Sequence, residues 1–110
     1  MDNKTEQMLA NREGLKEQIQ VRDAINRLYK NKDFRKVILD NFLVSDCARN
    51  ARISVSNMNP EARAKALACA QAAGYLDEYL QANILMGNNA ERELLALDAD
   101  EANSEEVEDL

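Results

Sequence analysis

The sequence predicts an all-α protein, a small helical bundle of three to four helices with a long C-terminal helix carrying a heptad repeat. Only five of the 110 residues are aromatic, proline and glycine together number four, and 31% of the residues are charged. This balance favours exposed helices over a sheet. A chain of this length supports one core. We therefore expect one domain over residues 1–103 and an acidic tail at residues 104–110.

The first predicted helix covers about residues 5–30. On a helical wheel its apolar side chains fall within one half, which is typical of an amphipathic helix with a broad buried face. The apolar half contains Met8, Leu15, Ile19, Val21, Ile25, Leu28 and Tyr29. The polar half contains Arg12, Glu13, Lys16, Gln20, Asp23 and Arg27.

The second predicted helix covers about residues 33–55, with Asp33 as its N-cap and a kink near Ser45. Before the kink, apolar side chains surround most of the helix: Phe34, Val37, Ile38, Leu39, Phe42 and Leu43. After the kink a new apolar stripe begins, with Arg49 and Arg52 facing away from it: Val44, Cys47, Ala48, Ala51 and Val55. A helix apolar on two sides needs either two covering helices or a partner.

The third predicted helix covers residues 60–102, because Asn59 and Pro60 form a strong start signal. Its apolar and small residues repeat every seven positions: Ala62, Ala66, Cys69, Ala73, Leu76, Leu80, Asn83, Gly87, Ala90, Leu94 and Leu97. This pattern predicts a helix-packing seam. Asn83 either sets the register of the seam or faces solvent. We expect one long helix with a bend at Gly87; a helix end at residues 87–89 is the alternative.

Charge divides the chain unevenly. Residues 1–90 carry a net charge of +2 and residues 91–110 one of −8. An acidic end of this kind is typical of a solvated tail, of an interaction tail or of a nucleic-acid mimic. No apolar run approaches the roughly 18 residues of a membrane span, and the start lacks a signal-peptide layout. Cys47 and Cys69 fit reduced, inert apolar positions in a cytosolic protein.

The residues needed for common catalytic sites are missing. The chain has no histidine, no glycine-rich phosphate loop, no cysteine paired with a base and no carboxylate cluster at metal-ligand spacing. We therefore predict no catalytic residues, no cofactor and no metal, and we do not expect an enzyme.

Basic residues gather in the middle of the chain, where residues 22–65 carry a net charge of +5. Such a surface is either a solvated face or a docking face for an acidic protein. Binding of phosphates is the weaker alternative, because no helix-turn-helix pattern is present. We predict a partner-binding surface with a basic rim and apolar anchors: Lys30, Lys32, Phe34, Arg35, Lys36, Ile38, Leu39 and Phe42. The apolar anchors pack in the core, bind a partner or do both.

Residues 27–49 contain a specific string: Leu28, Lys30-Asn31, Asp33-Phe34, Lys36, Val37-Ile38-Leu39, Asn41-Phe42-Leu43, Asp46, Ala48 and Arg49. This string resembles a small family of tailed-bacteriophage proteins of about this length, and the resemblance extends over residues 14–97. Lys32 stands where the family pattern favours proline. The resemblance implies an all-helical, phage-encoded protein often found among virion structural genes. It supplies no catalytic residue.

These observations predict a phage structural or assembly accessory protein that packs by helices against a larger capsid, portal or tail protein, or against itself. It would be made in the host cytoplasm and assembled into the virion. A small acidic regulator that inhibits a host protein is the alternative, with Val107 and Leu110 as hydrophobic contacts of its tail. A helical nucleic-acid-binding module is a weaker alternative, and no membrane partner is expected.

Overall fold

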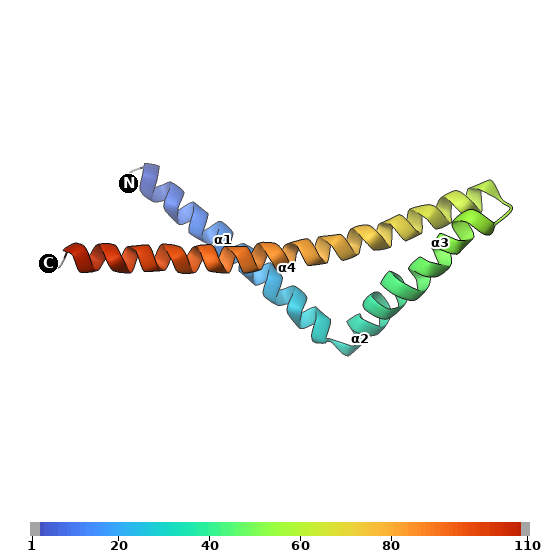
Figure 1. Ribbon diagram of the computed structural model, residues 1–110, viewed down its shortest axis with the longest axis horizontal. Helices are drawn as coiled ribbons and strands as arrows, with labels where there is room; N and C mark the ends of the chain where they lie inside the picture. Colours follow the sequence, from blue (N-terminus) through green and yellow to red (C-terminus); the bar gives the residue numbers. More distant parts are fainter. Residues whose placement is uncertain (1–2, 109–110) are drawn as a thin grey trace. The chain divides into compact units, whose positions relative to one another are not determined.

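The computed structural model describes residues 3–108 of the chain, with side chains described to residue 103. These residues form helices α1 (Asn3–Lys30), α2 (Lys32–Phe34), η1 (Arg35–Asp46), α3 (Cys47–Ser56) and α4 (Pro60–Glu108), and no strand lies among them (Figure 1). The predicted all-α class and the long C-terminal helix are confirmed.

The chain divides into two compact units where the sequence predicts a single domain. We call Met1–Ala24 with Asn83–Leu110 the terminal unit, and Ile25–Ala82 the central unit. The terminal unit pairs the beginning of α1 with the end of α4. The central unit contains the end of α1, the helices α2, η1 and α3, and the first part of α4.

The junction after α1 is fixed by Asn31, which corrects the predicted N-cap at Asp33. Asn31 has an extended backbone (φ −76°, ψ 124°), and its side-chain oxygen accepts a 2.9 Å hydrogen bond from the backbone N–H of Phe34. An extended residue with this bond is what an N-cap requires. Asp33 instead lies in the first turn, where its negative charge is favourable near the positive helix end.

The segment η1 is a π-helix, which has i→i+5 backbone hydrogen bonds and is therefore wound more loosely than an α-helix. Ser45 Oγ also donates a 3.2 Å hydrogen bond to the carbonyl oxygen five residues earlier, on Asp40. The half-buried apolar residues follow this looser winding in two rows with steps of four or five: Phe34, Ile38, Phe42 and Cys47, and Phe34, Leu39, Leu43 and Cys47. The predicted change of register near Ser45 thus coincides with a change from π to α winding at Cys47.

The turn between α3 and α4 is built from asparagines. Asn57 ends α3 in an extended conformation, and its side-chain oxygen accepts a 2.8 Å hydrogen bond from the N–H of Asn59. Asn59 Oδ1 in turn accepts hydrogen bonds from the N–H groups of Glu61 (2.9 Å) and Ala62 (3.4 Å), so it caps α4, which begins at Pro60. The turn reverses the chain and makes a hairpin of α3 and the start of α4 (Figure 1).

The positions of the predicted seam are buried or half-buried along α4. In the central unit Ala66, Ala73 and Leu80 are buried, and in the terminal unit Gly87 and Ala90 are buried. The other six are half-buried: Ala62, Cys69, Leu76, Asn83, Leu94 and Leu97. Because small residues fill most of the buried positions, helices can approach closely while burying little apolar surface per residue.

The helix α4 runs without a break through Gly87 and continues to Glu108, beyond the predicted end at about Ala102. The predicted contacts of Val107 and Leu110 lie outside the described side chains. The predicted inward face of α1 also needs correction at two positions, because Met8 and Leu28 are 46% and 41% exposed.

Candidate protein interaction surface

The predicted partner-binding residues separate into an inner and an outer set. Phe34, Ile38, Leu39 and Phe42 are half-buried, whereas Lys30, Lys32, Arg35 and Lys36 are exposed. The ring of Phe34 packs against Tyr29 with centroids 6.3 Å apart and the planes tilted by 36°. The apolar anchors therefore serve mainly the interior of the central unit, and the cations form its surface.

The exposed cations around the α1–η1 junction lack anionic partners within the described part of the chain. Arg27, Lys30, Lys32, Arg35 and Lys36 make no ion pair among residues 3–103. An unpaired surface cation is free to pair with a carboxylate on another molecule, and such complementary charges mainly raise association rate and specificity.

Exposed valines form an apolar row on η1 and α3 in the central unit. Val37, Val44 and Val55 are 57%, 63% and 81% exposed. The row continues through other exposed residues at alternating steps of four and three: Val37, Asn41, Val44, Ala48, Ala51 and Val55. We call this set the valine row. On the α-helical α3, residues at this spacing share one side; the π winding of η1 spreads Val37 and Val44 more widely.

The valine row corrects the predicted direction of the stripe after Ser45. Of its five predicted members only Cys47 is half-buried, and its Sγ lies 3.7 Å from the carbonyl oxygen of Ala70 on α4. Val44, Ala48, Ala51 and Val55 point away from the interior. In the sequence, the row is marked by alternating steps of four and three residues that pass through Asn41. Because Asn41 is polar, it interrupts the apolar pattern and makes the row difficult to recognise.

The terminal unit is joined by a buried arginine that the sequence pattern did not single out. Arg22 is 9% exposed; its Nη1 donates hydrogen bonds of 3.1 Å each to Asn88 Oδ1 and Glu91 Oε2, and its Nη2 lies 2.9 Å from Asp23 Oδ1. Hydrogen bonds to Glu91 and then to Asp23 raise the pKa of Arg22 above its ordinary value. Gly87 makes room for this arginine, because a Cβ there would lie 2.2 Å from the Cβ of Arg22.

A second arginine forms a similar contact nearer the end of α4. Arg12 Nη1 donates a 2.8 Å hydrogen bond to Asp98 Oδ1, and Nη2 lies 2.8 Å from Glu101 Oε1 in an ion pair without hydrogen-bond alignment. The hydrogen bond to Asp98 is the main cause of the raised pKa of Arg12. Since Arg12 meets later residues of α4 than Arg22 does, the two helical segments of this unit run antiparallel. The prediction that Arg12 faces solvent is wrong, because its side chain is only 18% exposed.

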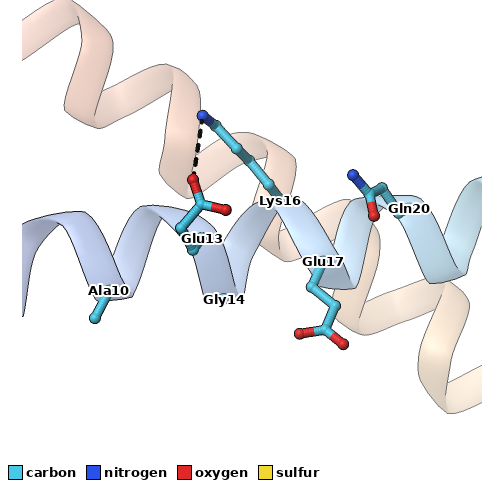
Figure 2. A pocket seen from close by; sticks show the side chains of 6 residues that line it. All are labelled: Ala10, Glu13, Gly14, Lys16, Glu17 and Gln20. Carbon is cyan, nitrogen blue, oxygen red and sulfur yellow. Dashed lines mark ion pairs between the residues drawn. The ribbon is translucent and has the colours of Figure 1, made fainter.

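Two open hollows lie around Gly14 on α1, where a missing side chain leaves free space. Figure 2 shows the residues that line the first: Ala10, Glu13, Gly14, Lys16, Glu17 and Gln20. Among them, Lys16 Nζ lies 3.8 Å from Glu13 Oε1, three residues earlier on the same helix. The second is lined by Ala10, Asn11, Gly14, Leu15, Gln18 and Glu93. The first hollow is formed by one helix alone, so it does not enclose a ligand.

The described residues contain neither a metal-binding cluster nor a membrane-spanning helix. Among residues 3–108, no group of three or more His, Cys, Asp or Glu residues is placed to hold a metal ion. In the same range, none of the helices combines the length and the apolar character needed to cross a membrane. Comparisons of the chain with protein-family models, curated proteins and solved structures give no match.

Proposed function

We propose that this chain is an assembly protein that packs the valine row of η1 and α3 against a helix of a larger protein or of another copy of itself. The observation that carries this proposal is the exposure of Val37, Val44 and Val55 on one short segment of the central unit. Large aliphatic side chains that are exposed on a helix are typical anchors of helix-in-groove contacts.

The setting of the row supports a protein partner. The unpaired cations Arg27, Lys30, Lys32, Arg35 and Lys36 precede it in the chain and would steer an acidic partner. A π-helical segment is itself uncommon and is often found at functional sites. Together with the resemblance of residues 27–49 to a family of tailed-phage proteins, these features make an accessory component of a phage particle the preferred function.

The test is the amount of this chain in purified particles of the phage that encodes it, measured by quantitative mass spectrometry against the portal and major capsid proteins. We expect a fixed ratio to them. The double variant Val44→Gln, Val55→Gln should be lost from particles, whereas Leu67→Gln, which alters an exposed leucine of α4, should be retained. Glutamine keeps helix propensity while removing the apolar surface.

An absence of the wild-type chain from particles, with abundance in infected cells, would overturn the particle assignment and support the regulator instead. Retention of the double variant at the wild-type ratio would show that the valine row is not the contact.

A further inference from the structure

The valine row has a counterpart on the terminal unit of the same chain. Leu85 and Leu95 of α4 are 59% and 63% exposed. They belong to a set of exposed residues at alternating steps of three and four: Leu85, Asn88, Arg92, Leu95, Ala99 and Ala102. We call this set the leucine row. It lies on the side of α4 away from the seam position Ala90, because the two sets are offset on the helix.

The two rows lie in surroundings of opposite charge. The central unit has nine basic and six acidic residues, a net charge of +3, while the terminal unit has five basic and fourteen acidic residues, a net charge of −9. Next to the valine row, Arg49 is 67% exposed despite its ion pair with Asp46, and Arg52 is exposed and without an ion pair among the described residues. Next to the leucine row, Glu91 and Asp98 keep exposed fractions of 54% and 57% despite their arginine partners.

We propose that copies of this chain associate head to tail, with the leucine row of one copy packed against the valine row of the next. This inference rests on the proposed function, because it identifies the partner of the valine row. Both rows combine large aliphatic side chains with alanines, Ala48 and Ala51 in the valine row and Ala99 and Ala102 in the leucine row, and alanines permit close helix packing. The carboxylates of Glu91 and Asp98 have acceptor capacity beyond their bonds within the unit, so they can also receive Arg49 and Arg52 of the neighbouring copy.

The contact is heterologous, because the two surfaces that meet are different. Such contacts either close into rings or grow into filaments, depending on the rotation between successive copies. An open assembly therefore keeps one free valine row at one end and one free leucine row at the other until it closes. Opposite net charges on the two units favour this arrangement over one in which like units meet.

The test is sedimentation velocity of the full chain over a wide range of concentration and salt. We expect the mean mass to rise with concentration beyond that of a dimer, and to fall at high salt because the charges are screened. Two variants remove one row each: Val44→Gln, Val55→Gln and Leu85→Gln, Leu95→Gln. Each should weaken association by about tenfold or more, which corresponds to about 1.4 kcal/mol. The control Leu67→Gln should associate like the wild type.

Mixing the two variants gives the decisive result. Each variant keeps the row that the other lacks, so an equimolar mixture should form a 1:1 heterodimer that does not grow further. A wild-type chain that stays monomeric at every concentration would overturn the inference, as would association that the leucine-row variant leaves unchanged. Either result, combined with loss of the valine-row variant from particles, would leave the proposed function standing. Retention of that variant in particles would count against the proposed function alone.

Discussion

The two units of this protein use their basic side chains in different ways. In the terminal unit, Arg12 and Arg22 are turned inward and form ion pairs with residues of α4. In the central unit, the contact between α3 and α4 is made by small and apolar groups such as Cys47 and Ala70, and most cations lie outside without an ion pair among residues 3–103. Ion pairs therefore join the two helical segments of the terminal unit, whereas most cations of the central unit are available for binding.

The largest expected effect comes from Leu80→Ala in the central unit. Leu80 is 6% exposed, so the change removes buried apolar volume and should lower the free energy of unfolding by about 2–5 kcal/mol. Denaturant unfolding gives the size of the effect, and hydrogen exchange should show faster opening of residues 25–82 in particular. Leu67→Ala, in the same helix at a position 49% exposed, should change stability by about 0.5 kcal/mol or less. Equal effects of the two changes would mean that apolar burial does not hold this unit.

A smaller loss is expected from Gly87→Ala in the terminal unit. The new Cβ would meet Arg22 at its Cβ and Cγ, at 2.2 and 2.9 Å, so turning the end of the arginine side chain does not relieve the clash. Overpacking of this kind costs about 1–3 kcal/mol. Hydrogen exchange should now increase in residues 3–24 and 83–103.

Gly74→Ala is the matched control for Gly87→Ala on the same helix. A Cβ on Gly74 has no neighbour within 4 Å, so alanine should raise stability by up to about 1 kcal/mol through its better helix propensity. If Gly87→Ala is also stabilising, the close approach of Arg22 to α4 is not present in solution.

The smallest effect concerns Tyr29 and alkaline pH. Burial, and then the nearby charge of Asp77, raise the pKa of Tyr29 above its ordinary value of 10.0. Above pH 10 the unfolded chain therefore loses this proton before the folded one does, so stability should fall as the pH rises through that range. Tyr29→Phe should remove part of this pH dependence and keep the packing on Phe34. Thermal unfolding of the wild type and of Tyr29→Phe between neutral and alkaline pH measures this pH dependence of stability. Identical profiles for the two proteins would exclude a contribution from Tyr29.

Periodicity predicted much of the architecture because it reports which side of a helix is apolar. The all-α class and the long C-terminal helix followed from it, and the seven-residue pattern from Ala62 to Leu97 marks positions that are buried or half-buried. The division into two units was not predictable, because a continuous apolar seam on α4 runs through both of them.

The errors arose where local chemistry overrode the pattern. Asp33 and Asn31 are both good caps, and only the extended backbone at Asn31 decides between them. The π winding of η1 changes which residues share a side, so a wheel drawn for an α-helix misplaced Val44. Arg22 was missed because a charged residue is expected outside unless a partner such as Glu91 is known in advance.

The small side chains of the α4 seam also affect how stability responds to temperature. Alanine and glycine expose little hydrocarbon to water when helices separate, and exposure of hydrocarbon is the main source of the heat-capacity increase on unfolding. The heat-capacity increase on unfolding should therefore lie below the usual value of about 12–15 cal/mol/K per residue. A calorimetric stability curve of this protein would then be broad and flat, with little loss of stability on cooling.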